Sequence, residues 1–427
     1  MNHAAIWQKA WPIILANAAV PLLGLADTAV IGNLGNLAQL GAIAFGAMIF
    51  SFIYWSFGFL RMGTTGFTAQ AAGAGDEAEI RATLARALMI SVGLGLVVIL
   101  LQGPLARIAL ALLEGSAEVE AITRDYFTIR IWGAPATLSV FALTGCLIGL
   151  GKSRLLLLVQ LFLNGLNILL DVLFAGVFGW GAQGIALGTV IAEWLAVLLA
   201  AGLVIRLLRQ RQADAESFWP WPRIGDARKM LRLMAANTDI LLRTLLLLFS
   251  FAWFINQSAR FGDAVLGANH ILLQLVSFSA FFLDGYAFVT EALVGEALGA
   301  KRRQDLAMAV RRSSELAAAT AVILALLIVF FGELAIAALT NIDAVRVAAG
   351  GALVWAGLYV LLSFAAFQLD GIFIGATRTR EMRNASFVSV LVFMLAWWWL
   401  TPLFGNHGLW CAFVIYVCAR ALALAAY

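Results

Sequence analysis

Charge is what this sequence lacks most. Only 12% of its 427 residues are charged and 63% are hydrophobic, whereas a typical soluble domain is about 25% charged. With 28 basic and 24 acidic residues, a chain of this length cannot cover a water-exposed surface. The composition therefore excludes the soluble, disordered and fibrous classes and indicates an integral membrane protein.

Cysteine, histidine and the common motifs of enzymes are also scarce. The three cysteines, Cys146, Cys411 and Cys418, lie in apolar segments without metal or redox spacing, so we interpret them as small buried hydrophobic side chains. The three histidines form no HExxH motif or paired site, and neither a Gly-x-Ser-x-Gly motif nor a P-loop is present. These absences argue against an intramembrane enzyme, a bound cofactor and the direct use of ATP.

Long apolar runs dominate the chain, and roughly 20 such residues suffice for a helix across a bilayer. We predict an all-α integral membrane protein with twelve transmembrane helices in two parallel, pseudo-symmetric six-helix lobes. The predicted helices cover residues 10–33, 40–72, 82–113, 123–150, 155–178, 181–208, 230–258, 265–298, 306–338, 345–376, 384–404 and 407–426. The predicted domains are an N-terminal lobe (1–208), a cytoplasmic linker (209–229) and a C-terminal lobe (230–427).

The distribution of basic residues predicts the orientation, because cytoplasmic loops are enriched in Lys and Arg. If the N-terminus is cytoplasmic, then Lys9, Arg420 and the loops after even-numbered helices hold most of the basic residues. We therefore expect both termini on the cytoplasmic side of a bacterial inner membrane. The net charge of +4 then reflects these loops and does not indicate a nucleic-acid partner.

The two halves of the chain are related by an internal repeat. Residues 141–154 align with residues 367–380 at an offset of 226 positions, and the same offset pairs Thr64 with Thr290. Each half holds an even number of predicted helices, so both halves enter the membrane from the same side. Parallel repeats of this kind are typical of transporters that work by alternating access.

The N-terminal half carries polar residues within its predicted helices. Asp27 lies in the first helix and Asp171 in the fifth, both in the outer half, and Asn167 precedes Asp171 by four residues. Thr189 and Glu193, also four apart, lie at a similar depth in the sixth helix. Ionisable groups inside a membrane are costly and mark functional sites by default. The pattern predicts a cation-coupling pocket, although the carboxylates could instead serve only to join neighbouring helices.

Two cations are compatible with this pocket. A close pair of buried carboxylates can exchange a proton near neutral pH, whereas Na⁺ could be held by Asp27 and Asp171 with oxygen atoms of Asn167 and Thr189. At the repeat offset, Asp27 corresponds to Trp253 and Asp171 to Trp397. The pocket is therefore absent from the second lobe, which argues against a purely structural role in the repeat.

Two prolines in the first predicted helix indicate that it can bend. Pro12 and Pro21 lie within this helix, and Pro21 precedes Asp27 by six residues. A proline in a membrane helix releases a backbone carbonyl from its hydrogen bond and permits a kink. Protonation of Asp27 could bias such a bend, which gives a coupled transporter two states to alternate between.

The C-terminal half carries a second set of ionisable residues, in the inner half of its helices. This set consists of Asp239, Arg243, Asp284, Glu291 and Asp370. A cluster of ion pairs lowers the cost of such residues in a membrane, and both a structural role and a role in substrate gating are open. Arg61 and Arg130 have no partner that the sequence identifies.

Five segments resemble the multidrug and toxic compound extrusion (MATE) family, and in particular its DinF-like branch. They are GLADTAVIG around Asp27, NILLDVLF from Asn167, NTDILLRTL around Arg243, LDGYAFVTEALVGEALGA around Asp284, and DGIFIGATRTREMRNA from Asp370. The resemblance implies a cation-coupled exporter whose coupling aspartates correspond to Asp27 and Asp171, with Asn167 and Thr189 in their network. Arg243 stands where the better-known branch has a glutamate, which disfavours a Na⁺ site in the second lobe.

We therefore expect a monomeric antiporter, surrounded by membrane lipid and driven by H⁺ in preference to Na⁺, that exports bulky hydrophobic or cationic organic compounds by alternating access. A flippase for lipid-linked precursors, which related folds perform, is the alternative. It would require a strongly basic cavity, and the intramembrane basic residues are Arg61, Arg130 and Arg243. A major-facilitator transporter is disfavoured because the loop between the second and third helices lacks that family's Asp-Arg turn.

Overall fold

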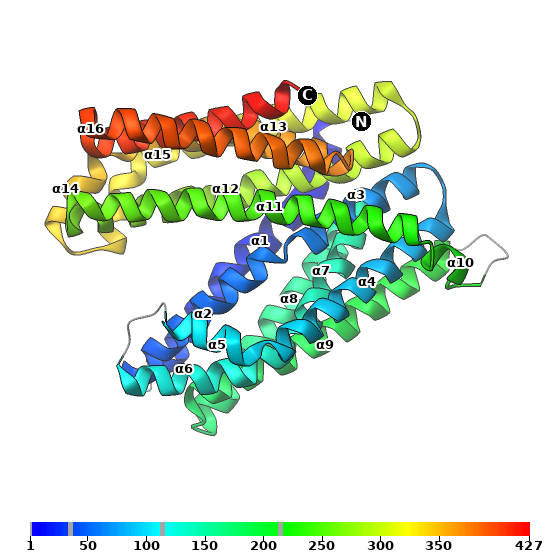
Figure 1. The fold of residues 1–427 in the computed structure, drawn as a ribbon, viewed down its shortest axis with the longest axis horizontal. Coiled ribbons are helices and arrows are strands. Elements are labelled where there is room, and N and C mark those ends of the chain that lie inside the picture. Colours follow the sequence, from blue (N-terminus) through cyan, green and yellow to red (C-terminus); the bar gives the residue numbers. More distant parts are fainter. Residues whose placement is uncertain (1, 33–36, 112–115, 212–216) are drawn as a thin grey trace. The chain divides into compact units, whose positions relative to one another are not determined.

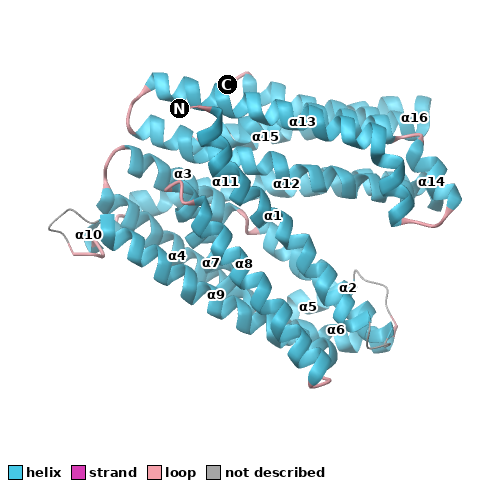
Figure 2. Ribbon diagram, turned by 180° about the vertical axis from the view of Figure 1, so that it is seen from behind, coloured by secondary structure: helices cyan, strands magenta, loops and turns pink. Residues whose placement is uncertain are grey.

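The computed structural model describes residues 2–32, 37–111, 116–211 and 217–427, without the side chains of 20–29, 31–32 and 37. All regular secondary structure in these ranges is helical, as Figures 1 and 2 show. The chain divides into two compact units. The N-terminal unit is Leu15–Met234, and the C-terminal unit is Met1–Ile14 together with Ala235–Tyr427.

The N-terminal unit contains most of α1 and the helices up to the start of α11. Their bounds are α1 (His3–Gly32), α2 (Leu37–Ser56), α3 (Phe59–Gly73), α4 (Glu77–Leu100), α5 (Gln102–Ala111), α6 (Ala117–Arg130), α7 (Ala134–Gly149), α8 (Ser153–Asp171), α9 (Gly181–Arg211) and α10 (Trp221–Ile224). A short 3₁₀ turn, Ile131–Gly133, joins α6 to α7, and a π-helical turn, Val172–Val177, follows α8.

The C-terminal unit contains the remaining long helices. Their bounds are α11 (Ala227–Ser258), α12 (Asp263–Gly299), α13 (Arg303–Leu339), α14 (Asp343–Gly350), α15 (Leu353–Gly375) and α16 (Thr379–Ala425). A 3₁₀ turn, Ala259–Phe261, follows α11. Gly405 interrupts α16 with φ 58° and ψ −132°, close to Pro402, so α16 holds both of the last two predicted spans.

The helices have the length and composition of membrane spans. Ten helices of the described residues are long and apolar enough to cross a bilayer, and α16 includes two predicted spans. Large apolar side chains such as Phe330 and Trp398 are more than two-thirds exposed, as expected for surfaces that contact lipid. The prediction of an all-α membrane protein is confirmed.

The internal repeat is visible in the backbone of the two units. The positive φ angles of Gly75 (70°) and Gly151 (65°) recur at Lys301 (56°) and Thr377 (54°), each 226 positions later. Non-glycine residues with positive φ are uncommon. Two matched pairs therefore indicate that the repeat retains the turn geometry even where another residue replaces glycine. The same offset relates Gly179 (71°) to the α16 interruption at Gly405.

The repeat also sets how closely helices cross within each unit. A Cβ atom on Gly145 of α7 would lie 2.5 Å from the carbonyl oxygen of Arg61 on α3. At the equivalent crossing, a Cβ atom on Gly371 of α15 would lie 2.6 Å from the carbonyl oxygen of Ala287 on α12. Both crossings need glycine because a larger residue would force the helices apart.

The first turns of α1 pack with the C-terminal unit. Ile6 is fully buried there, the rings of Trp7 and Tyr286 lie 6.4 Å apart, and a Cβ atom on Gly285 would lie 2.3 Å from Ile14. In this respect the compact units differ from the predicted lobes, which assign residues 1–208 to one body. The packing of these apolar turns against α12, not chain order, groups them with the second half.

Candidate functional site

Asp171 is a buried carboxylate at the end of α8, directly before the π-helical turn. Its side chain is 0% exposed, and the Asn167 amide, also 0% exposed, donates a hydrogen bond from Nδ2 to Asp171 Oδ2 at 2.5 Å. The four-residue spacing had placed the two side chains on one helix face. π-helical turns inside α-helices occur frequently at functional sites, so the local backbone also marks this position.

Helix α9 closes the other side of the Asp171 carboxylate. A Cβ atom on Gly188 would lie 2.9 Å from Asp171 Oδ1, so only glycine allows this approach. The neighbouring Thr189 is 6% exposed, and its hydroxyl donates to the carbonyl oxygen of Ile185 at 2.9 Å. Gly188 was not among the predicted site residues, because one sequence does not show which glycines permit a close approach.

Asp27 lies in α1, but its side chain is outside the described residues, as is that of Pro21. The helix assignment runs from His3 to Gly32 and so includes Pro12; the predicted bend stays a prediction. The repeat offers indirect support for the expected pairing of Asp27 with Asp171. The rings of their counterparts Trp253 and Trp397 lie 5.0 Å apart at an interplanar angle of 86°.

Glu193 forms a buried ion pair with Arg130. The distance from Arg130 Nη1 to Glu193 Oε2 is 2.7 Å, and the two residues are 8% and 5% exposed. The guanidinium carbon also lies 5.0 Å from the centre of the Phe50 ring and 5.4 Å from that of Tyr54. The structure thus identifies Glu193 as the partner of Arg130, and the Glu193 carboxylate already has a positively charged neighbour. The other arginine without a predicted partner, Arg61, lies half-buried on α3.

Space for this ion pair comes from Gly133 in the 3₁₀ turn. A Cβ atom there would lie 2.0 Å from Glu193 Oε2 and 3.1 Å from Arg130 Nη1. Any larger residue would displace the carboxylate. The turn between α6 and α7 is therefore shaped around the pair.

In the C-terminal unit, Asp370 accepts hydrogen bonds from two arginines. Arg243 Nη2 contacts Asp370 Oδ2, and Arg420 Nη2 lies 2.8 Å from the same oxygen. All three residues are less than 9% exposed. Arg420 was expected among the cytoplasmic charges, but it is buried within α16. Its place inside the apolar run 407–426 was the available signal.

Asp239 lies one turn before Arg243 on α11 and binds a different set of residues. Asp239 Oδ1 accepts from Arg383 Nη1 at 2.7 Å, and Oδ2 accepts from the Thr379 hydroxyl at 3.1 Å. On α12, Glu291 is 1% exposed and Asp284 is half-buried. The predicted second set is therefore split over several contacts along the unit.

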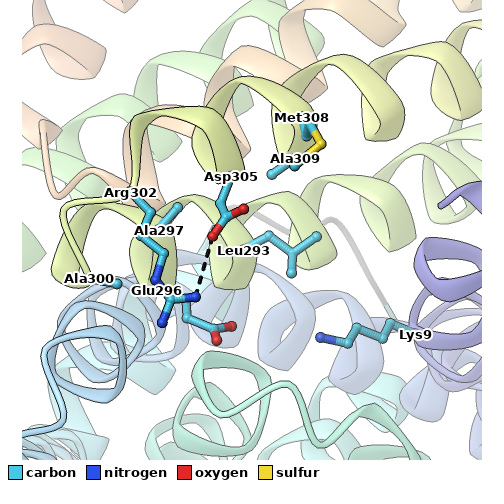
Figure 3. Close-up of a pocket in the computed structure, with 9 residues that line it drawn as sticks. All are labelled: Lys9, Leu293, Glu296, Ala297, Ala300, Arg302, Asp305, Met308 and Ala309. Atoms are coloured by element: carbon cyan, nitrogen blue, oxygen red, sulfur yellow. Dashed lines mark hydrogen bonds and ion pairs between the residues drawn. The ribbon is translucent and has the colours of Figure 1, made fainter. Parts of the chain in front are cut away.

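A cavity of about 270 Å³ lies in the C-terminal unit beside the turn from α12 to α13 (Figure 3). Lys9 points into it from α1 toward the side that carries Glu296. Arg302 and Asp305 form an ion pair of 3.4 Å at its edge. The cavity thus presents two basic and two acidic side chains, and this balance favours neither an anion nor a cation.

The linker is attached to the start of α4 by charged contacts in the N-terminal unit. These contacts are Arg211 with Glu77 at 2.7 Å, Arg223 with Asp76 at 2.8 Å, and Lys229 with Glu79 at 2.6 Å. The charges of the linker therefore serve a structural purpose in addition to the orientation that they predict.

Comparisons with known proteins identify the class of protein. The profile of the MatE family matches residues 12–173 and 240–399, which together make up most of the chain. The chain belongs to this family and is a multi-pass membrane transporter, not an enzyme. The resemblance drawn from the sequence is thereby confirmed.

The same comparisons find individual proteins whose sequences are similar to this chain. The chain is 38% identical over 425 residues to the DNA damage-inducible protein F of Escherichia coli (strain K12), covering 100% of this chain and 92% of that protein. It is 26% identical to Protein DETOXIFICATION 44, chloroplastic, of Arabidopsis thaliana, covering 98% of this chain and 80% of that protein.

Solved structures share the fold. An outward-facing multidrug resistance MATE family transporter of the MOP superfamily aligns with a TM-score of 0.87 at 19% identity, covering 98% of this chain and 93% of that one. A MOP superfamily transporter from Pyrococcus furiosus aligns with a TM-score of 0.86 at 18% identity, covering 99% and 94%. At these identities the likeness concerns the fold alone.

Proposed function

We propose that this chain is a proton-coupled antiporter that exports bulky hydrophobic or cationic organic compounds by alternating access. The family supplies the class of activity, and one observation carries the assignment of its coupling site. Asp171 is a fully buried carboxylate held by Asn167 inside a membrane-spanning helix. Such a group is costly inside a membrane and by default marks a site of ion or substrate movement.

The surroundings of Asp171 support a proton over Na⁺. Hard cations prefer several oxygen ligands, and the Asn167 side chain directs its amide N–H, not its oxygen, toward Asp171 Oδ2. A proton needs only one carboxylate oxygen. The coupling ion is accordingly H⁺, loaded at Asp171 and Asp27.

Glu193 has a supporting role in this proposal. Its ion pair with Arg130 is buried, and Thr189 lies one turn away on the same helix. Because Arg130 already accompanies the Glu193 carboxylate, Glu193 positions α9 and does not load the coupling ion.

The proposed setting is the bacterial cytoplasmic (inner) membrane, with the protein as a monomer surrounded by lipid and both termini cytoplasmic. The basic loops that follow even-numbered spans support this orientation. A flippase for lipid-linked precursors is less well supported, because the buried arginines Arg130 and Arg243 both bind carboxylates. A diphosphate would have to compete with those carboxylates.

Transport in proteoliposomes with separately imposed pH and sodium gradients tests the proposal. We expect a pH gradient alone to drive uptake of a fluorescent lipophilic cation into the proteoliposomes, and a sodium gradient alone to have no effect. Asp27→Asn should abolish the response to the pH gradient. Transport driven by sodium alone, or full proton-driven transport by Asp27→Asn, would contradict the proposal.

A further inference from the structure

Helices α11 and α16 run side by side in the C-terminal unit. Asp239 on α11 binds Arg383 on α16, and the Trp253 ring contacts the Trp397 ring further along both helices. Both steps span 14 residues, so the helices are parallel and in register, as Figure 1 also shows for α11 and the first half of α16. Residues one turn beyond the tryptophans are therefore level with each other as well.

Four buried polar atoms gather along this register without a hydrogen bond to any described residue. They are Trp253 Nε1 and Gln257 Oε1 on α11, and Trp397 Nε1 and Thr401 Oγ1 on α16. Gln257 follows Trp253 by four residues, as Thr401 follows Trp397, so each pair shares one helix face. Gln257 is only 1% exposed. Buried polar groups in folded proteins are nearly always bonded, so four together require a reason.

The neighbouring contacts show that this unit can satisfy buried polar groups. The indole N–H of Trp410 donates to Asn269 Oδ1 at 2.9 Å, and Asn269 Nδ2 donates to Ser258 Oγ and Asn406 Oδ1, each at 2.7 Å. Trp410 and Asn269 are both 0% exposed. Satisfied groups thus lie close in sequence to the four unsatisfied ones, and Trp410 has a structural role that Trp253 and Trp397 do not share.

We infer that Trp253, Gln257, Trp397 and Thr401 form a substrate-binding site for flat aromatic compounds that carry a carbonyl or ester oxygen. An indole N–H is a donor only, and a hydroxyl can also donate, so three of the four atoms can bind an acceptor oxygen. The two indole rings, perpendicular to each other, offer aromatic surface on which a flat ring can pack. This inference rests on the proposed function, because it names the compounds that the exporter takes.

The repeat explains why such a site lies in this unit. Trp253 and Trp397 occupy the positions of Asp27 and Asp171, so donors of hydrogen bonds replace carboxylates at equivalent places. The N-terminal unit then loads the cation, and the C-terminal unit recognises the acceptor oxygen of the substrate. Each half of the repeat has its own chemistry.

Two dyes that differ by one ester group provide a direct test. Tetramethylrhodamine methyl ester and tetramethylrosamine share the same cationic xanthylium core, but only the first carries an ester. We expect the purified full chain in nanodiscs to bind the ester dye roughly five- to tenfold more tightly, as measured by fluorescence anisotropy, because one or two hydrogen bonds add this much. Trp253→Phe and Trp397→Phe keep an aromatic ring but lose the indole N–H, so each variant should bind the two dyes with equal affinity.

Control variants separate the site from general effects. Trp399→Phe changes a 68% exposed tryptophan of the same helix and should leave both affinities unchanged. Equal affinity of the wild type for both dyes would overturn the inference, because it would mean that the four polar atoms bind only water and not the ester. A preference for the ester that survives Trp253→Phe and Trp397→Phe would also overturn it. Absence of gradient-driven transport would instead refute the proposed function, since dye binding in nanodiscs requires no gradient.

Discussion

The two units of this transporter place a buried aspartate in contrasting surroundings on similar backbones. In the N-terminal unit, Asp171 accepts a hydrogen bond from the neutral amide of Asn167. In the C-terminal unit, Asp370 accepts hydrogen bonds from two buried guanidinium groups, those of Arg243 and Arg420. The comparison teaches that a buried carboxylate is not by itself a coupling site: its partner decides whether it is available to a mobile cation.

The largest expected effect is the loss of the folded protein when the C-terminal cluster is broken. Asp370→Ala leaves Arg243 and Arg420 buried without this carboxylate, which costs about 3–5 kcal/mol. We expect a sharp loss of monodisperse protein in fluorescence-detected size-exclusion chromatography. Arg420→Met is the matched control, because it leaves the pair of Arg243 with Asp370 intact. Normal yield and melting temperature for Asp370→Ala would show that the cluster is not structural.

Breaking the ion pair of the N-terminal unit should destabilise the fold less, and a second substitution should restore the lost stability. Glu193→Gln leaves the Arg130 guanidinium buried beside a neutral amide, and we expect a cost of about 2–4 kcal/mol. Arg130→Met combined with Glu193→Leu removes both charges and should recover most of the thermal stability. A double variant as unstable as Glu193→Gln alone would mean that the two charges are not coupled.

Close packing around Asp171 predicts an effect on transport more than on folding. Gly188→Ala places a Cβ atom 2.9 Å from Asp171 Oδ1, so the carboxylate must shift, at a cost of about 1–3 kcal/mol. We expect proton-driven transport to fall about tenfold or more, because 1.4 kcal/mol is a factor of ten. Gly165→Ala on α8, where nothing lies within 4 Å, serves as the control. Unchanged transport by Gly188→Ala would argue against a coupling role for the Asp171 carboxylate.

The smallest effect is expected outside the membrane spans, at Asp226. The backbone N–H of Lys229, together with that of Arg228, lowers the pKa of the Asp226 carboxyl. A lowered pKa stabilises the fold above the unfolded value of about 3.9, and this contribution is lost as the pH falls through the folded value. Asp226→Ala should therefore lower the melting temperature slightly at pH 7 and not in strong acid. If the melting temperatures of the variant and the wild type differed equally at both pH values, the lowered pKa of Asp226 would be excluded as the cause.

Much of the fold was predictable from the sequence because its causes are periodic or local. Apolar runs predicted the helices, and the repeat offset of 226 positions recurs in the positive φ angles of Gly75 and Lys301. The four-residue spacing of Asn167 and Asp171 predicted that both side chains lie on one face of a single helix, and the structure joins them there by a hydrogen bond.

The contacts between helices were not predictable in the same way. Glu193 lies 63 positions from Arg130, and Asp370 lies 50 positions from Arg420, so no periodicity within one helix connects them. Gly133 and Gly188 act through the absence of a side chain, and one sequence does not distinguish such glycines from others. The placement of Met1–Ile14 with the second unit likewise depends on packing that only the structure shows.

The most direct test of the contrast between the units is the ion coupling of Asp171→Asn in proteoliposomes. This substitution retains the size of the side chain and a hydrogen-bonding group toward Asn167, but it removes the proton-binding carboxylate. We predict that the variant still binds the dye and exchanges it down its own gradient, while transport driven by a pH gradient falls to the level of empty vesicles. Proton-driven transport at the wild-type rate would contradict the assignment of Asp171 as the coupling residue.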